Sequence, residues 1–346
     1  MRLFLTGGTG FIGQAFVRAA RRRGWSLAAL VRDPGTTQAR WIASQGCDLV
    51  PGDVTQPDGL RGVLKGVDVL LHNAGVYELG ASRAERRRMH LVNVQGTDNV
   101  LRAAAEDGVP RTVYVSSAWA LGPTGGERRA EPHGRPGRYL SPYEESKVLA
   151  HGVALLWRAR GLPLVAALPN AVVGANDHSV FGHFLRLYLL GAMPPMAFGL
   201  DAVYAVVDVL ALAEGLCLAV ERAPMGEDFL FCGEAEPLRA TFQRWRRYPG
   251  GSRRTVAVPR WLMMPLLAPL EPLQRRLGLP AFLSRDTVRA SRGSLDYSAS
   301  RTMRELGWTH PPADEMWDRI IGEERALMSR RNGFLGRLRH QAIVEA

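Results

Sequence analysis

The chain has 346 residues, of which 46% are hydrophobic and 22% charged, so it can bury a large core and is not broadly disordered. Its formal charge is +11, with arginine runs at Arg21–Arg23 and Arg86–Arg88. We interpret these runs as solvated helix faces, since no helix-turn-helix, zinc-finger or RNA-binding motif indicates a nucleic-acid partner. An anionic substrate or an anionic membrane surface is the alternative interpretation.

The three cysteines, Cys47, Cys217 and Cys232, have neither metal-binding nor redox spacing, which favours reduced thiols in the cytoplasm and no bound metal. We expect no signal peptide, because glycines interrupt the first apolar run. No stretch reaches the roughly 20 apolar residues that cross a bilayer. The sequence therefore predicts a soluble protein that is at most peripheral to a membrane.

The first thirteen residues, MRLFLTGGTGFIG, combine a short strand, three glycines and the start of a helix. Their spacing is typical of a dinucleotide-binding turn, in which glycines permit the sharp turn, the approach of a pyrophosphate and close helix–strand packing. Exposed N–H groups at the start of the helix then bind phosphate oxygens. The cofactor contacts predicted here are Thr6, Gly7, Gly10, Phe11, Ile12 and Gly13.

The second predicted strand, Ser26–Val31, is followed by Arg32 and Asp33. A carboxylate at the end of this strand binds the ribose hydroxyls of NAD, whereas an arginine there pairs with the extra phosphate of NADP. Asp33 comes too late to be the usual ribose ligand. Arg32 therefore favours NADP(H) over NAD(H), the alternative being that Arg32 is an ordinary surface arginine.

Further strands are predicted at 47–54, 67–72, 111–116 and 163–169, separated by helices at 38–45, 58–64, 84–107 and 142–160. This alternation predicts an α/β fold with a Rossmann-type, doubly wound parallel sheet. Asp53 and Val54 end the third strand, where they would meet the adenine. Asn73, Ala74 and Gly75 form a small-residue turn where the cofactor would pass.

The second half is less regular, with helices predicted at 180–190, 207–221, 237–247, 259–277, 298–306 and 314–330 and a strand at 229–231. We assign residues 1–170 to a dinucleotide-binding domain and 171–330 mainly to a substrate-binding region, with segments near 203–232 returning to the first domain. Residues 331–346 are predicted to be a basic tail. The Gly-, Pro- and Arg-rich loop at 122–141 is expected to border the active site.

Tyr143 and Lys147 lie four residues apart, on one face of a predicted helix. A lysine ammonium beside a phenol favours the phenolate and lowers a pKa that is ordinarily about 10. The tyrosine then exchanges a proton with a carbonyl or alcohol oxygen. Ser116 and Ser117 end the fifth strand, at the sheet edge where ligands bind, and their hydroxyls are placed to hydrogen-bond that oxygen.

The motifs TGGTGFIG, GDVT, HNAG, NVQGT, YVSSA and YEESK, followed by LPNAVVGAN, YAVVDV and LDYSASRTMRELGW, extend over nearly the whole chain. In this set the chain resembles the extended short-chain dehydrogenases/reductases of the epimerase/dehydratase superfamily. Within them it is most similar to the dihydroflavonol-reductase and 3β-hydroxysteroid-dehydrogenase branch.

The resemblance implies that Ser117 is the catalytic serine, with Ser116 as the alternative, that Tyr143 is the proton donor and that Lys147 is its partner. It implies a supporting role for Asn93, cofactor contacts from Tyr143, Lys147, Pro169 and Val172, and a homodimer formed through the helices at 84–107 and 143–160. Leu168 and the lone Asp208 depart from many nucleotide-sugar members, which weakens a nucleotide-sugar substrate.

The leading hypothesis is an NADP(H)-dependent reductase or dehydrogenase that interconverts a carbonyl and a secondary alcohol on a hydrophobic small molecule. One alternative is a nucleotide-sugar epimerase or dehydratase with retained NAD, which the basic loop near Arg128 and Arg135 mildly favours. Another is a non-catalytic NADP-binding sensor or scaffold. Substrate specificity is expected to come from residues 175–201 and 259–290.

The segment 259–280, PRWLMMPLLAPLEPLQRRLGLP, is apolar, interrupted by prolines and flanked by arginines. We favour a lid helix over the substrate pocket. An interfacial segment that contacts a membrane is the alternative. The basic C-terminal stretch is expected to be a frayed tail or, alternatively, a contact with an anionic surface.

Overall fold

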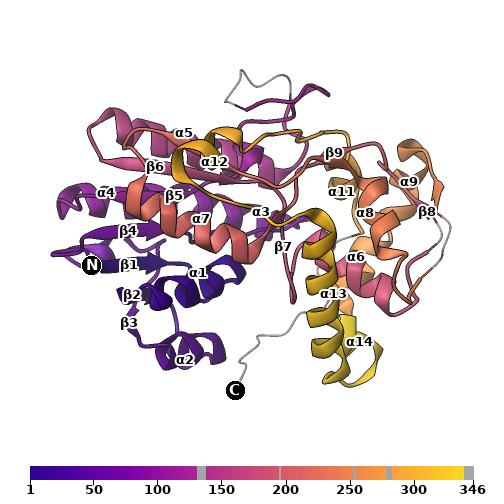
Figure 1. Cartoon of the computed structure of the whole chain (residues 1–346), viewed down its shortest axis with the longest axis horizontal. Helices are drawn as coiled ribbons and strands as arrows, with labels where there is room; N and C mark the ends of the chain where they lie inside the picture. The colour runs from indigo at the N-terminus through magenta and orange to yellow at the C-terminus, as the bar shows by residue number, and fades with distance from the viewer. Residues whose placement is uncertain (131–137, 195, 252–254, 278–282, 339–346) are drawn as a thin grey trace.

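A computed structural model of the chain describes residues 1–130, 138–194, 196–251, 255–277 and 283–338. A parallel sheet of seven strands forms its centre, in the order β3-β2-β1-β4-β5-β6-β11 (Figure 1). The strands are β1 (Arg2–Thr6), β2 (Ser26–Val31), β3 (Cys47–Pro51), β4 (Val69–His72), β5 (Thr112–Val115), β6 (Leu164–Pro169) and β11 (Asp228–Phe231). The predicted Rossmann-type parallel sheet is confirmed.

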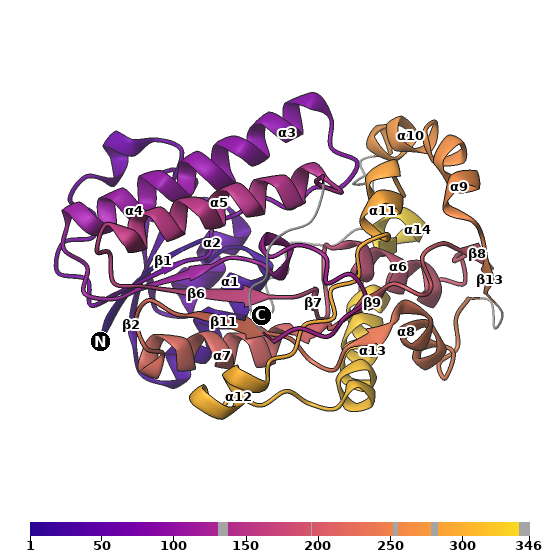
Figure 2. The same ribbon diagram turned by 90° about the horizontal axis from the view of Figure 1, so that it is seen from above.

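Helices cover both faces of this sheet, as Figure 2 shows from above. On one face lie α3 (Arg83–His90), α4 (Gly96–Glu106) and α5 (Pro142–Ala159). On the other face, α1 (Phe11–Arg22) packs against α7 (Val209–Arg222), and α12 (Ser300–Leu306) packs on α7 and β11. Because both faces are covered, the strands are almost continuously apolar. Fully buried strand residues include Leu3, Leu5, Leu70, Leu71 and Val113.

Three predicted elements in the first 110 residues differ from the structure in detail. The third strand ends at Pro51, before Asp53 and Val54, and the helix expected at 58–64 is only a 3₁₀ turn at Pro57–Leu60. The long helix expected at 84–107 contains a π-helical segment at Leu91–Gln95, after which α4 begins at Gly96. A Cβ on Gly96 would lie 2.8 Å from Cγ2 of Val54, so glycine lets this helix pack closely against the loop that follows β3.

The remaining elements gather beyond the carboxyl ends of the strands (Figure 1). The helices of this region are α6 (Val180–Leu189), α8 (Leu238–Trp245), α9 (Arg260–Leu267), α10 (Leu270–Arg276), α11 (Arg285–Ala290), α13 (Ala313–Ser329) and α14 (Gly333–Leu338). The helix predicted at 259–277 is therefore two helices, since Pro269 separates α9 from α10. A core around Trp245 and Trp317 joins α6, α8 and α13.

The start of the expected basic tail is folded instead. Arg331 is 3% exposed, and Leu338 in α14 is 3% exposed and packs against Leu187 of α6. Arg331 is held by Glu324 of α13, whose carboxylate also pairs with the buried Arg186. The prediction of a frayed tail is wrong for residues 331–338, because buried ion pairs and an apolar contact fix them; residues 339–346 lie outside the described residues.

Candidate active site

The glycine turn after β1 is shaped for close contact with a ligand. Gly7 has φ +72°, and a Cβ there would lie 2.7 Å from backbone atoms of Asn73 and Ala74. A Cβ on Gly13 would lie 2.1 Å from the carbonyl oxygen of Gly7, so only glycine lets α1 start against the turn. Gly10 is the N-cap of α1 and supplies no side-chain cap, which leaves the first N–H groups of the helix available to a phosphate.

A buried hydrogen-bond network fixes the small-residue turn next to the glycines. Nδ1 of His72 lies 2.7 Å from Oγ1 of Thr6, and its Nε2 lies 3.0 Å from Oγ1 of Thr97. Thr6 accepts a hydrogen bond from the N–H of Ala74, and the Asn73 amide donates to the carbonyl of Gly7. Burial lowers the pKa of His72 to about 3, so the ring is neutral and acts as a structural bridge.

At the adenosine end, Arg32 is exposed and borders the same cavity as the glycine turn. Asp33 does not line it: its carboxylate accepts a 2.8 Å hydrogen bond from the N–H of Gly35. Asp53 and Val54 line the cavity opposite, and the carboxylate of Asp53 is held by the N–H and hydroxyl of Thr55 at 2.8 Å. The guanidinium of Arg32 is therefore available to a ligand at the end of β2, whereas the carboxylate of Asp33 is hydrogen-bonded within its own turn.

Ser117, Tyr143 and Lys147 meet at the carboxyl end of β5. Ser141 caps the N-terminus of α5, which begins with Pro142, so Tyr143 stands in the first turn and Lys147 one turn further on. The hydroxyls of Tyr143 and Ser117 are hydrogen-bonded. Nζ of Lys147 lies 3.5 Å from the carbonyl oxygen of Val115. The same nitrogen lies close to Gly75, where an added Cβ would be 3.7 Å from it. The three side chains line one cavity.

The electrostatics of this group differ from the sequence-based expectation. Burial raises the pKa of Tyr143 to about 12, and the hydrogen bond from Ser117 opposes that rise. Burial also lowers the pKa of Lys147 to about 8, so the lysine holds its charge weakly. The expectation that Lys147 brings the phenol pKa below its ordinary value is therefore wrong for the protein alone, because burial is the main cause of both pKa shifts.

Asn93 lies next to the Ser117–Tyr143–Lys147 group, and it is 2% exposed within the π-helical segment. Its side chain accepts a 2.7 Å hydrogen bond from the N–H of Val76 and donates to the carbonyl of Val76 and to Oγ of Ser146. Asn93 thus ties the loop after β4 to α5, between Tyr143 and Lys147. It does not line the cavity, and neither does Gly13.

Comparison with known proteins identifies the lineage. A model of the NAD dependent epimerase/dehydratase family matches residues 3–231, which is most of the chain. The chain belongs to this family. It is 30% identical over 313 residues to a putative dihydroflavonol 4-reductase of Synechocystis, covering 88% of this chain and 89% of the relative. It is 31% identical over 342 residues to the human 3 beta-hydroxysteroid dehydrogenase type 7, covering 88% and 90%.

Among solved structures, the crystal structure of gox2253 superimposes with a TM-score of 0.78 and 30% identity, covering 94% of this chain and 98% of the other. The family binds a nicotinamide dinucleotide, and its members are enzymes of the oxidoreductase or epimerase type. The relationship to reductases and 3β-hydroxysteroid dehydrogenases within this family is thereby confirmed.

The structure brings nearly all the predicted site residues of this epimerase/dehydratase-family chain to one cavity of about 750 Å³. Those that line it are Thr6, Gly7, Gly10, Phe11, Ile12, Arg32, Asp53, Val54, Asn73, Ala74, Gly75, Ser117, Tyr143, Lys147, Pro169 and Val172. Among the described residues, no group of His, Cys, Asp and Glu side chains is arranged to hold a metal ion. Arg135 lies outside the described residues.

Beyond Tyr143 the cavity continues into an apolar chamber. It is lined from the two ranges expected to set specificity, by Phe181, Phe184, Leu187, Met193 and Phe198 and by Met263, Leu266, Leu267 and Leu270. Tyr77, Tyr204 and Phe242 also line it and were not predicted. Tyr77 follows the turn after β4 by two residues, and this position at the ligand-binding edge was a usable signal. Tyr204 lies in the short strand β9 (Val203–Tyr204) and Phe242 on α8, and their spacing in the sequence did not mark either side chain as facing the cavity.

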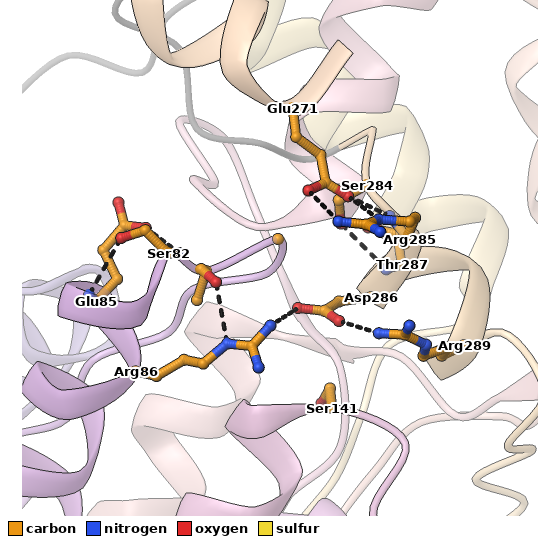
Figure 3. Close-up of polar contacts among 12 residues, drawn as sticks. Ser82, Glu85, Arg86, Ser141, Glu271, Ser284, Arg285, Asp286, Thr287 and Arg289 are labelled. Carbon is orange, nitrogen blue, oxygen red and sulfur yellow. Dashed lines mark hydrogen bonds and ion pairs between the residues drawn. The ribbon is translucent and has the colours of Figure 1, made fainter. Parts of the chain in front are cut away.

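Ion pairs join α10 and α11, which close this chamber, to the start of α3 (Figure 3). The guanidinium of Arg86 lies 3.8 Å from the buried carboxylate of Asp286, which also pairs with Arg289 at 3.0 Å. Arg275 of α10 donates to the carbonyl of Gly80 and lies 3.8 Å from Glu85. These contacts hold the chamber roof against the dinucleotide-binding half.

Proposed function

We propose that this protein is an NADP(H)-dependent reductase or dehydrogenase that interconverts a carbonyl and a secondary alcohol on a hydrophobic small molecule. The observation that carries the proposal is the direct continuity between the Ser117–Tyr143–Lys147 group and the apolar chamber lined by Phe181, Phe184 and Met263. A hydrocarbon-rich substrate gains from burial in such a chamber, at about 25 cal/mol per Å² of apolar surface. The reactive oxygen of the substrate would then lie beside the hydroxyls of Ser117 and Tyr143.

The residues present fit a nicotinamide dinucleotide. The Gly7–Gly13 turn leaves no room for side chains and presents the N-terminus of α1, which suits a pyrophosphate. The exposed Arg32 suits a 2′-phosphate, because a guanidinium forms paired charge-assisted hydrogen bonds with phosphate oxygens. With Asp33 engaged by Gly35, Arg32 supports NADP(H) over NAD(H).

When bound, the nicotinamide supplies or accepts the hydride. In the reducing direction, the hydroxyl of Tyr143 donates its proton to the substrate oxygen, because its raised pKa keeps it protonated at neutral pH. The hydroxyl of Ser117, already hydrogen-bonded to Tyr143, holds the same oxygen in line. Lys147, fixed beside Gly75 and Val115, is placed to hold the nicotinamide ribose and to stabilise the tyrosinate left behind.

The relatives support an oxidoreductase: one is named as a putative dihydroflavonol 4-reductase and another as a 3 beta-hydroxysteroid dehydrogenase. Both names describe oxidation or reduction at an oxygen-bearing carbon of a ring system. Leu168, where many nucleotide-sugar members carry arginine, is fully buried in β6 and supplies no positive charge to the chamber. The free, buried cysteines Cys47, Cys217 and Cys232 support a reducing, cytoplasmic location.

The deciding experiment is the nucleotide content of freshly purified protein, followed by titration with NADPH and NADH. Protein that emerges empty and binds NADPH much more tightly than NADH supports a consumed co-substrate. A panel of apolar ketones and aldehydes, assayed by NADPH oxidation, then identifies the substrate class. Stoichiometric release of NAD would overturn the proposal in favour of a cofactor-retaining epimerase or dehydratase. Tight NADPH binding without turnover on any carbonyl would favour a sensor.

A further inference from the structure

The helix pair α9–α10 has an outer surface almost free of charge. Between Val256 and Gln274 the sequence carries only two charged residues, Arg260 and Glu271. The guanidinium of Arg260 donates to the side chain and the carbonyl of Ser291, and the buried carboxylate of Glu271 pairs with Arg285 (Figure 3). Both charges are therefore used on the inner side of the pair.

What remains outside is apolar. We name this surface the apolar lid face; its exposed members are Val256, Pro259, Trp261, Leu262, Pro265, Leu266, Pro269, Pro272, Leu273 and Leu277. Trp261 is 74% exposed, Val256 64% and Leu266 55%. Single exposed apolar residues are ordinary, but a contiguous set of this size on a folded chain marks a surface that contacts something apolar.

We propose that the apolar lid face docks onto the surface of an anionic lipid bilayer. No helix among the described residues is long and apolar enough to span a membrane, so the contact we infer is interfacial. Tryptophan and leucine side chains partition into the boundary between headgroups and acyl chains, which is where a short amphipathic helix lies. The prolines at 259, 265, 269 and 272 keep the pair short and bent, as suits a contact that enters the bilayer only shallowly.

The charges at the edge of this face select the sign of the lipid. Arg276 is exposed at the end of α10, and on the neighbouring α11 Arg285 and Arg289 are about half exposed while they pair with Glu271 and Asp286. The whole chain carries +11. Arginines at the edge of an inserted apolar surface lie at headgroup depth, where they bind lipid phosphates and add attraction to an anionic membrane.

The same edge argues against a second copy of the chain as the occupant. In a two-fold contact both copies contribute the same surface, so each copy would add the positive charges of Arg276 and Arg285 to one interface. Figure 2 shows α9 and α10 at the opposite end of the molecule from α4, at its outer edge. A positively edged apolar face fits a deformable anionic surface better than it fits its own copy.

The inner side of the same helices forms the wall of the active-site cavity. Met263, Leu267 and Leu270 line the chamber, and Leu266 both lines it and is half exposed outside. Only one layer of side chains thus separates the docked bilayer from the chamber. An apolar substrate could then pass between the lipid and the cavity without crossing water. This consequence rests on the proposed function, whereas the docking of the face onto a bilayer does not rest on it.

The test is flotation of the full-length protein with vesicles of phosphatidylcholine, with and without phosphatidylglycerol. We expect binding to the anionic vesicles that weakens with salt. The double variant Trp261→Glu/Leu262→Glu should bind at least about tenfold more weakly, since neither side chain lines the cavity and both would bring charge into the apolar layer. Leu210→Glu is the matched control, because Leu210 on α7 is 41% exposed and Leu262 is 42% exposed.

Retention of vesicle binding by the double variant would overturn the proposal, and so would the absence of binding by the wild-type chain. If the wild-type protein does not bind vesicles but self-associates, and the double variant abolishes that association, the apolar lid face forms an interface between copies of the chain instead. NADPH affinity, measured in solution for each variant, confirms that the cofactor site is intact. It also separates failure of docking from failure of the proposed enzyme activity.

Discussion

The rings of Tyr77 and Tyr143 meet edge to face, with their centroids 4.7 Å apart. Two phenols therefore stand side by side at the entrance to the apolar chamber, and burial raises the pKa of both. Their hydroxyls have different partners, because Tyr143 is hydrogen-bonded to Ser117, whereas Tyr77 accepts a hydrogen bond from the backbone of Val180. Only Tyr143 has its hydroxyl in the catalytic group.

This difference predicts opposite results for two equivalent substitutions. Tyr143→Phe should lower kcat by about 10²–10⁴-fold, because the proton donor is lost while the ring and its packing remain. Tyr77→Phe should alter kcat by no more than a few-fold, since it removes only a hydroxyl held by Val180. Steady-state kinetics with equal NADPH affinity in both variants would check this. A large loss of kcat in Tyr77→Phe would show that the proton donor has been assigned to the wrong tyrosine.

The pKa of Lys147, lowered to about 8 by burial, predicts the pH dependence of reduction. Lys147 is charged below this value and loses its charge above it, whereas Tyr143 stays protonated up to a pKa of about 12. The value of kcat/KM for carbonyl reduction should therefore be level below pH 8 and fall as the pH rises through it. In Lys147→Arg, whose side chain stays charged, the fall should vanish from this range. A fall that persists unchanged in that variant would contradict the assignment.

Arg32 predicts the cofactor preference. Arg32→Ala should weaken NADPH binding about 10- to 100-fold and leave NADH binding nearly unchanged, because in the proposed complex the guanidinium would contact only the 2′-phosphate. Fluorescence titration with both nucleotides measures this ratio. Arg304→Ala is the control, since Arg304 is exposed on α12, far from the cavity. Equal loss of NADPH and NADH affinity in Arg32→Ala would indicate a general effect on the fold.

Local sequence patterns were enough to predict the cofactor half of the site. The Gly7–Gly13 turn and the Tyr143–Lys147 pair each lie within a few residues of chain, so spacing alone specifies their geometry. The chamber could be assigned only to ranges, because Tyr204 in β9 and Phe242 on α8 reach it through the tertiary packing of elements that are distant in the chain. The pKa of Tyr143 was also beyond a sequence argument, because it depends on burial by residues distant in the chain.

The same limit applied to the two ends of the substrate-binding region. The sequence showed that residues 259–280 are apolar, but not that the charged groups of Arg260 and Glu271 bond to Ser291 and Arg285. It likewise showed a basic C-terminal stretch without revealing that Arg331 is buried against Glu324. From the sequence alone, a charged residue is predicted to be exposed to solvent. Burial of such a residue requires an oppositely charged partner, and that partner is known only from the tertiary structure.

We propose that the chain forms a homodimer through α5 and the π-helical segment beside it. Leu149 and Leu156 lie two helical turns apart on α5 and are 39% and 60% exposed, and the adjacent Leu91 is 42% exposed. Leu156→Glu should convert the dimer to a monomer, because it places two charges in the centre of an apolar two-fold contact. Sedimentation velocity measures the change, with Leu210→Glu as control. A wild-type chain that is monomeric at all concentrations would refute the dimer.

The last prediction concerns the ion pair between Arg86 of α3 and Asp286 of α11, which joins the two halves over the chamber (Figure 3). Arg86 is half exposed, so the pair itself adds little to stability, and Asp286 keeps Arg289 as a partner when Arg86 is replaced. Arg86→Gln should therefore leave the melting temperature nearly unchanged. It should instead raise KM for the substrate several-fold, because the chamber roof is held less firmly, while NADPH affinity stays constant. Arg87→Gln, which replaces an exposed neighbour on the same helix, is the control. An unchanged KM in Arg86→Gln would show that Arg275, through Gly80 and Glu85, is enough to hold the roof.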